Sequence, residues 1–294
     1  MSKRRAYIAW VVVCLVWGTT YLAIRLALES LPPLLMAGVR WIVAGTILVV
    51  FFALRGHRFP PLRLWGSLTV RGILLIGFGN GAVVWAEQTV PSGLTSVLVA
   101  IVPFWMVGVE AVYRDGESIA VRQWLGLVMG FIGILVLIWP QLGFDVNGRA
   151  FAAGVVATQL ACAGWALGSA YARRIDRRSE AEATIGPACE MLFGGAALLI
   201  AGVAVGEQPH PNVTLRSAAA FLYLVVFGSI VAFSAYRYAI QHLPVATVSL
   251  YAYVNTVLAM TLGTLVLDEP FSWRIGLGAA VVLVAIGVVK ERDG

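Results

Sequence analysis

Charged side chains are scarce in this 294-residue sequence. Only 12% of its residues are Asp, Glu, Lys or Arg, against roughly 25% in soluble domains, while 60% are apolar. No charge occurs between Glu87 and Glu110, or between Arg122 and Asp145. A soluble core has no room for apolar stretches this long and this numerous, so the composition excludes an ordinary soluble domain and predicts a polytopic membrane protein.

Lysine, histidine and cysteine are also rare, and each scarcity excludes a class of chemistry. The only lysines are Lys3 and Lys290, so no Walker A motif exists and ATP is excluded as the direct energy source. All three His and all five Asp fall in expected loops or the tail, which leaves no buried Ser-His pair, aspartyl pair or HExxH motif. The sequence has three cysteines, an odd number, and all lie inside apolar stretches. This pattern favours thiols packed between helices over a disulfide or a metal site. We expect no enzyme, cofactor or metal site.

The apolar stretches predict an all-α membrane protein with ten transmembrane helices. Charges, prolines and polar turns bracket them at about 7–26, 34–54, 69–88, 94–112, 120–139, 150–171, 184–205, 217–238, 245–266 and 273–289. Basic residues then predict the orientation, because cytoplasmic loops carry an excess of Lys and Arg. With the N-terminus inside, 16 of the 21 basic residues lie on the cytoplasmic side. Both termini should therefore be cytoplasmic, and the +6 net charge needs no nucleic-acid partner.

The two halves of the sequence repeat each other at a spacing of about 150 residues. Trp17 matches Trp165, Phe78-Gly79 matches Phe227-Gly228, and Pro91 matches Pro244. The expected units are 1–142 and 148–294, with five helices each. Because five is odd, the second unit enters the membrane from the opposite side, so the pattern predicts an inverted repeat. Secondary transporters often have this architecture, with the substrate site at the midplane between the halves.

Several of these landmarks also resemble a known family. They are Trp17-Gly18-Thr19-Thr20-Tyr21, Arg25, Pro32-Pro33, Arg40, Val90-Pro91-Ser92-Gly93, Pro103, Gly116-Glu117, Gly126, Tyr251-Ala252-Tyr253-Val254-Asn255 and Asp268-Glu269. Together they look like the drug/metabolite transporter superfamily and, within it, the ten-helix EamA-type exporters, similar to YddG-like aromatic amino-acid exporters. The resemblance covers essentially the whole chain and implies the inner membrane. It departs at Thr256, where the family often has Pro.

Helix interruptions at matched depths point to a midplane site. Gly77, Gly79 and Gly81 interrupt the third span, and Pro103 interrupts the fourth, because Pro removes a backbone hydrogen bond. Gly228-Ser229 and Asn255-Thr256 mark the corresponding depths of the second half. Close helix packing at small residues is the alternative explanation for the glycines.

Aromatic residues deep in the spans are the candidate walls of a substrate site. Trp normally gathers at the membrane interfaces, and Trp10, Trp41, Trp65, Trp124, Trp139 and Trp273 fit that belt. The deeper candidates for substrate binding are Trp17, Tyr21, Phe78, Trp85, Trp105, Trp165, Tyr236 and Tyr251, with the amides of Asn80 and Asn255. Stacking and cation-π contacts suit flat or cationic solutes. Ordinary packing of the aromatics, and stapling of helices by the amides, remain alternatives.

Ionisable residues inside spans are a functional hypothesis by default. Arg40 and Glu87 should both lie in the periplasmic third, where they are candidates to pair, and Glu190 stands at the position that repeats Arg40. The three are candidates for coupling or for structural anchoring. Anchoring is the reading favoured for Arg40.

The sequence thus predicts a bacterial inner-membrane transporter that exports small organic metabolites by alternating access, with amino acids including aromatic ones as the favoured substrates. A broad-spectrum drug/proton antiporter of the same superfamily and a non-transporting membrane scaffold are the alternatives. A channel is disfavoured by the lack of charged rings. The expected partners are the small-molecule substrate and the lipid bilayer, with the chain as a monomer or a homodimer.

Overall fold

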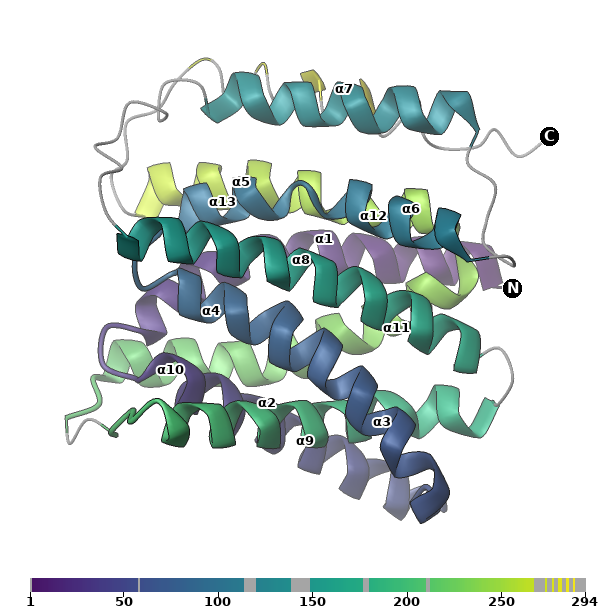
Figure 1. The fold of residues 1–294 in the computed structure, drawn as a ribbon, viewed down its shortest axis with the longest axis vertical. Coiled ribbons are helices and arrows are strands. Elements are labelled where there is room, and N and C mark those ends of the chain that lie inside the picture. Colours follow the sequence, from purple (N-terminus) through teal and green to yellow (C-terminus); the bar gives the residue numbers. More distant parts are fainter. Residues whose placement is uncertain are drawn as a thin grey trace.

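The computed structural model describes residues 2–57, 59–113, 120–138, 149–176, 180–209 and 212–266, together with isolated residues between 273 and 288. Its regular elements within these ranges are all helices (Figure 1). The first half comprises α1 (Ser2–Ala27), α2 (Pro33–Leu54), η1 (Leu62–Leu64), α3 (Trp65–Gly72), η2 (Ile73–Gly81), α4 (Ala82–Ala86), α5 (Ser92–Val99), α6 (Val102–Val112) and α7 (Val121–Ile138). The second comprises α8 (Arg149–Asp176), α9 (Glu180–Ala204), α10 (Leu215–Tyr223), η4 (Leu224–Val231), α11 (Ala232–His242), α12 (Val245–Ser249) and α13 (Tyr251–Val266).

Eight helical stretches in the described part of the chain are long and apolar enough to cross a membrane. They are Lys3–Ala27, Pro33–Leu54, Leu62–Ala86, Ser92–Val112, Arg149–Ile175, Ile185–Ala204, Leu215–His242 and Val245–Leu262, and each coincides with a predicted span. The span predicted at 120–139 is the helix α7, which is not among these eight. The span predicted at 273–289 lies largely outside the described residues.

The helices α2 and α9 end in the same way, 150 residues apart. Gly56 has φ +84° and Gly206 has φ +81°, a left-handed conformation that glycine adopts at little cost. In both turns the following N–H closes the helix, from His57 to Phe52 O at 3.0 Å and from Glu207 to Gly202 O at 2.9 Å. These are Schellman caps, which satisfy carbonyls that the helix end leaves unpaired.

Two wide-turn segments mark the middle of the third and eighth predicted spans. η2 contains Gly77, Gly79 and Gly81, and η4 contains Gly228 and Ser229, and both are π-helical. The predicted interruptions of these two spans are therefore present. π-helical turns often occur at functional sites.

The fourth and ninth spans break one turn earlier than the sequence pattern suggests. The break before Pro103 is at Ala100–Ile101, between α5 and α6, so Pro103 lies in the first turn of α6, where its missing N–H costs nothing. In the second half the break is at Leu250, between α12 and α13. The prediction of an interruption at Asn255-Thr256 is wrong, because both residues keep their N–H groups and lie inside α13.

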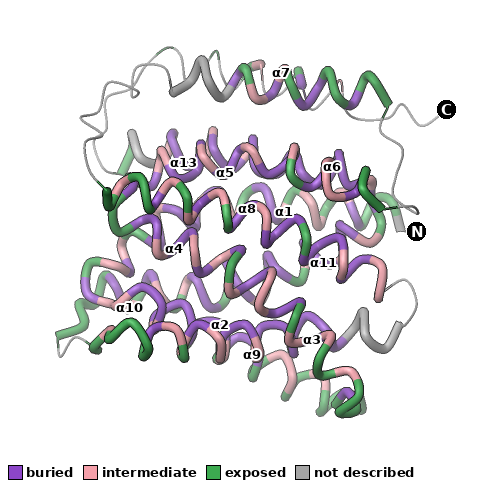
Figure 2. Tube along the Cα trace, in the orientation of Figure 1, coloured by how far each residue is buried: buried purple, intermediate pink, exposed green. Residues whose placement is uncertain are grey.

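The elements of the two halves interleave in space. α2 packs along α9, α1 packs against α13 and α11, and α8 crosses η2 (Figure 1). Buried residues follow the middle of the bundle, while exposed residues lie along its edges, as on α7, α3 and α9 (Figure 2). Many of the exposed side chains are large and apolar, such as Ile47, Leu54 and Ile200. In a membrane protein such an outer surface faces lipid.

Candidate functional site

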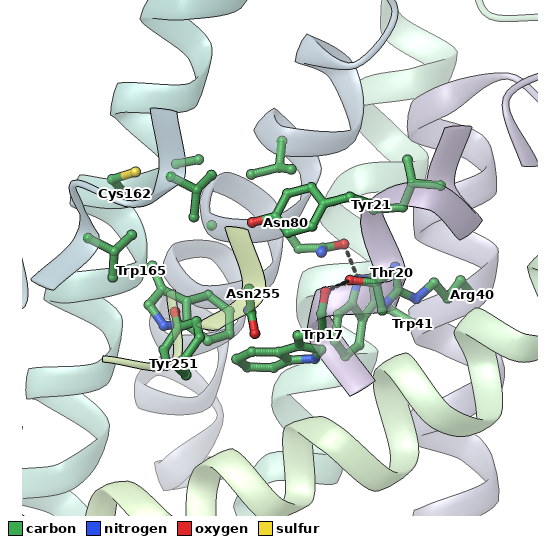
Figure 3. Close-up of a pocket in the computed structure, with 16 residues that line it drawn as sticks. Trp17, Thr20, Tyr21, Arg40, Trp41, Asn80, Cys162, Trp165, Tyr251 and Asn255 are labelled. Carbon is green, nitrogen blue, oxygen red and sulfur yellow. Dashed lines mark hydrogen bonds between the residues drawn. The ribbon is translucent and has the colours of Figure 1, made fainter. Parts of the chain in front are cut away.

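A cavity lies at the centre of the bundle, where helices of both halves meet (Figure 3). It is lined by Trp17, Thr20, Tyr21, Ile24, Arg40, Trp41, Gly79, Asn80, Val83, Val99, Val102, Ala161, Cys162, Trp165, Tyr251 and Asn255. The space between their atoms, including the part open to solvent, is about 610 Å³. The volume open to the centres of water molecules is only about 70 Å³, so the cavity is narrow.

Four aromatic rings cluster on one side of the site. The Trp17 ring lies with its centroid 5.2 Å from each of the rings of Trp165, Tyr236 and Tyr251. Two of these contacts are edge-to-face and the third is tilted, arrangements that the quadrupoles of aromatic rings favour. Trp165 and Tyr251 lie on one side of the view in Figure 3, with Arg40 and Trp41 on the other.

Each half of the chain holds the deep tryptophan of the other half. Trp17 Nε1 of α1 donates to the carbonyl of Gly228 in η4 at 3.0 Å. Trp165 of α8 packs against Gly79 of η2, where an added Cβ would lie 2.7 Å from a ring carbon. The close approach of the Trp165 ring requires the glycine at position 79, whereas a Cβ on Gly228 would instead meet Arg40 Nη2 at 2.9 Å and Thr20 Cγ2 at 3.2 Å. Gly79 lines the cavity and also packs closely against Trp165, so both explanations offered for this glycine, a place in the site and close helix packing, apply to it.

Two amides reach the cavity from η2 and α13. Trp41 Nε1 donates to Asn80 Oδ1 at 2.7 Å, and a dashed line in Figure 3 marks this bond. The Asn255 amide nitrogen donates to the carbonyls of Cys14, at 2.9 Å, and Tyr251, at 3.0 Å, in the orientation that satisfies its neighbours. Asn255 therefore also holds α13 to α1, as the stapling alternative anticipates.

Arg40 is the one charged residue among those that line the cavity. It is 1% exposed. Its Nε donates to Ser229 Oγ of η4 at 2.7 Å, and its guanidinium carbon lies 4.8 Å from the centre of the Trp41 ring. Nη1 is buried without a hydrogen-bond partner. The Ser229 bond joins α2 to η4, so Arg40 has an anchoring contact and retains an unused donor.

Six of the ten predicted substrate-binding residues line the cavity, namely Trp17, Tyr21, Asn80, Trp165, Tyr251 and Asn255. Tyr236 does not, but its buried ring backs Trp17 and Trp165, and its hydroxyl shares a 2.6 Å hydrogen bond with that of Ser169. Phe78 is 47% exposed and Trp105 is 40% exposed, while Trp85 is partly buried and packs against the core. These three are not among the residues that line the cavity, since depth along an all-apolar helix does not reveal which face points inward.

Trp41 lines the cavity, although the sequence predicts it for the interfacial belt. Its side chain is 1% exposed, so that prediction is wrong. Its neighbour Arg40 was the available signal, because a charge within a span requires polar or aromatic company. Thr20, Cys162 and several aliphatic residues of the wall carried no comparable signal. Within the described residues, no group of three or more His, Cys, Asp or Glu could hold a metal.

Glu87 and Arg40 do not pair, although the sequence made them candidates to do so. Glu87 is fully buried, and neither of its carboxylate oxygens has a hydrogen-bond partner. Arg25 contacts its backbone, with Nη1 donating to Glu87 O at 2.7 Å.

Glu190, by contrast, lies between two arginines. Its Oε1 is 3.0 Å from Arg71 Nε and 3.3 Å from Arg237 Nη2, and all three side chains are buried. Glu110 similarly contacts Arg173 at 3.3 Å and Arg174 at 2.6 Å. Arg71, Arg173 and Arg237 are among the basic residues that the sequence predicts on the cytoplasmic side, and all three are buried in these ion pairs. None of these residues lines the cavity.

Comparison with known proteins supplies the family. The model of the "EamA-like transporter family" matches residues 4–139 and again residues 152–290. The "Uncharacterized inner membrane transporter YedA" of Escherichia coli K12 is 39% identical over 93% of this chain and 88% of its own. The "Probable amino-acid metabolite efflux pump" of the same strain is 24% identical over 97% and 94%.

A solved crystal structure shares the fold. It matches with a TM-score of 0.79 and 19% identity, over 98% of this chain and 96% of the other. At that identity the likeness concerns the fold alone. Two matches to one family model, eight membrane-length apolar helices and the similarity to an inner-membrane transporter agree with one another. The chain belongs to the EamA-like transporter family of the drug/metabolite transporter superfamily and is a multi-pass transporter of the inner membrane.

Proposed function

We propose that this protein exports small organic metabolites, with amino acids including aromatic ones as its substrates. The observation that carries the proposal is the character of the cavity. Its wall combines five aromatic rings with two amides and one arginine, and none of the described residues that line it is Asp or Glu. An apolar wall with a few polar groups is typical of sites for small organic molecules. The name of the similar efflux pump supports amino-acid metabolites.

A drug/proton antiporter is the alternative, and the cavity wall argues against it. An antiporter for cationic drugs needs a carboxylate for which substrate and proton compete. Glu190 is held by two arginines away from the cavity wall, and Glu87 is not in that wall either. We therefore propose that net flux follows the solute gradient.

We further propose that access alternates through exchange between two inverted five-helix units, 1–142 and 148–294. Support comes from the double match to one family model. The paired features 150 residues apart add to it: the Gly56 and Gly206 caps, the π-helical segments, and the reciprocal Trp17–Gly228 and Trp165–Gly79 contacts. In such transporters the two halves rock around a fixed central site.

Transport in proteoliposomes tests the function. Labelled amino acids, other aromatic metabolites and cationic dyes should be offered with and without a pH gradient. We expect flux of the amino acids that falls severalfold in Trp17→Ala and Trp165→Ala, and that an imposed pH gradient barely changes. Phe227→Ala, an aromatic substitution on the exposed surface, is the matched control. Uphill accumulation driven by the proton gradient favours the antiporter, and absence of any flux favours the scaffold.

Orientation is tested by single-cysteine labelling. Cys14, Cys162 and Cys189 are buried and can be replaced to give a cysteine-free background. Leu62→Cys, before the third span, should react only from the cytoplasm, and Val213→Cys, before the eighth, only from the periplasm, because both side chains are exposed. The reverse pattern would contradict the placement of both termini in the cytoplasm.

A further inference from the structure

The central cavity carries a positive charge that no described residue neutralises. Arg40 is the one charged side chain among the sixteen residues of the wall. It forms no ion pair with a described residue; its polar contact is the neutral hydroxyl of Ser229, and Nη1 has no partner. A buried charge that lacks a counter-charge is costly in a low-dielectric interior. An anion in the cavity would remove that cost.

A second donor lies on the other side of Trp41. The indole N–H is a donor only, so the Asn80 atom that it meets at 2.7 Å is the oxygen. The Asn80 NH₂ group is therefore directed away from Trp41, and no hydrogen bond from it to another described residue occurs. Arg40 packs on the face of the same indole. Trp41 thus holds a guanidinium and an amide in place on one wall of the cavity, opposite the rings of Trp165 and Tyr251 (Figure 3).

We propose that Arg40 and the Asn80 amide form a carboxylate-binding subsite, and that the transported solutes are carboxylates with an apolar or aryl group. The inference rests on the proposed function and narrows its substrate class. The guanidinium suits a planar carboxylate because it presents several N–H donors in a fixed plane. The aryl group would then contact Trp17, Trp165 and Tyr251. Cations that lack a carboxylate are disfavoured, since they would meet Arg40 without an acidic side chain in the wall.

The test uses three ligands that share one phenyl ring: 3-phenylpropionate, phenylalanine and phenethylamine. Binding to the purified full-length protein in detergent is measured by isothermal titration, and flux of the same ligands is measured in proteoliposomes. We expect the two carboxylates to bind at least about tenfold more tightly than phenethylamine, because a hydrogen-bonded charge is worth about a factor of ten or more. Phenethylamine binding equal to or tighter than that of the carboxylates would overturn the subsite.

Variants separate carboxylate binding from anchoring. Arg40→Gln and Asn80→Asp should each weaken binding of the carboxylates about tenfold or more and leave phenethylamine unchanged or tighter. Ser229→Ala removes the anchoring bond but keeps the charge, so carboxylate selectivity should persist. If Arg40→Gln does not fold, Asn80→Asp still decides, because it places a negative charge in the subsite. Equal loss for all three ligands in the variants that fold would show that Arg40 and Asn80 are structural and overturn the subsite.

Binding and flux fail independently. Selective carboxylate binding without flux would support the subsite and overturn the proposed transport. Flux of the three ligands without a preference for the carboxylates would support the proposed transport and overturn the subsite. Neither binding nor flux of the carboxylates would overturn both.

Discussion

Buried charges are paired at one end of the bundle and unpaired nearer the cavity and the opposite end. Where α1 begins and α8 and α11 end, Glu190 contacts Arg71 and Arg237, and Glu110 contacts Arg173 and Arg174. Arg40 and Glu87 have no ion pair among the described residues. Positions 40 and 190 correspond in the two halves but carry opposite charges, so the comparison shows one scaffold position used in two ways. At position 190 the charge holds helices together, and at position 40 it faces a cavity.

The largest expected effect is at the paired end. Glu190→Gln removes the negative charge that Arg71 and Arg237 share, and leaving buried arginines without it should lower the free energy of unfolding by about 3–5 kcal/mol. Thermal or denaturant unfolding in detergent measures the loss. The control is Glu29→Gln, whose partner Arg216 is 3.6 Å away with both side chains well exposed, so a change below about 1 kcal/mol is expected. Similar losses for the two variants would contradict a structural role for the buried cluster.

An intermediate effect is expected at the cavity, from substitutions of two glycines that stand two residues apart in η2. A Cβ on Gly79 would lie 2.7 Å from the Trp165 ring and 3.2 Å from Leu74 O, whereas one on Gly77 meets nothing closer than Ile73 at 3.8 Å. Gly79→Ala should cost about 1–3 kcal/mol by overpacking and displace Trp165, so flux should fall severalfold. Gly77→Ala should retain both stability and flux. Equal flux in the two variants would show that the position of Trp165 is unimportant for transport.

A smaller effect is expected at the start of α2. Pro32 provides no side-chain cap, and the carboxylate of Glu207 instead accepts the N–H groups of Leu34 and Leu35 at 3.0 and 2.9 Å. Glu207→Ala should lower the free energy of unfolding by about 1–2 kcal/mol, the usual value of a helix cap. The exposed neighbour Gln208 supplies the control Gln208→Ala, which should have no measurable effect. The unfolding midpoints of the two variants decide the point.

The sequence by itself predicted where the eight membrane-length helical stretches of the described residues lie. Apolar length sets these limits, because a chain in lipid must satisfy its backbone within each span. The paired landmarks also predicted the interruptions at η2 and η4 and the deep positions of Trp17 and Trp165. The location of the second helix break at Leu250 escaped prediction, since no proline marks it.

Only the tertiary structure decided which face of each helix points inward. In a span that is apolar all round, Trp41 and Trp105 carry no difference in pattern that separates a buried ring from an exposed one. Partners from distant helices made that choice: Asn80 for Trp41, and Glu190 for Arg71 and Arg237. The surroundings of Arg40 were likewise set by packing between distant helices. Its depth within a span follows from the sequence, but only the packed cavity shows that no described acidic residue lies beside it, and the proposed carboxylate subsite rests on that arrangement.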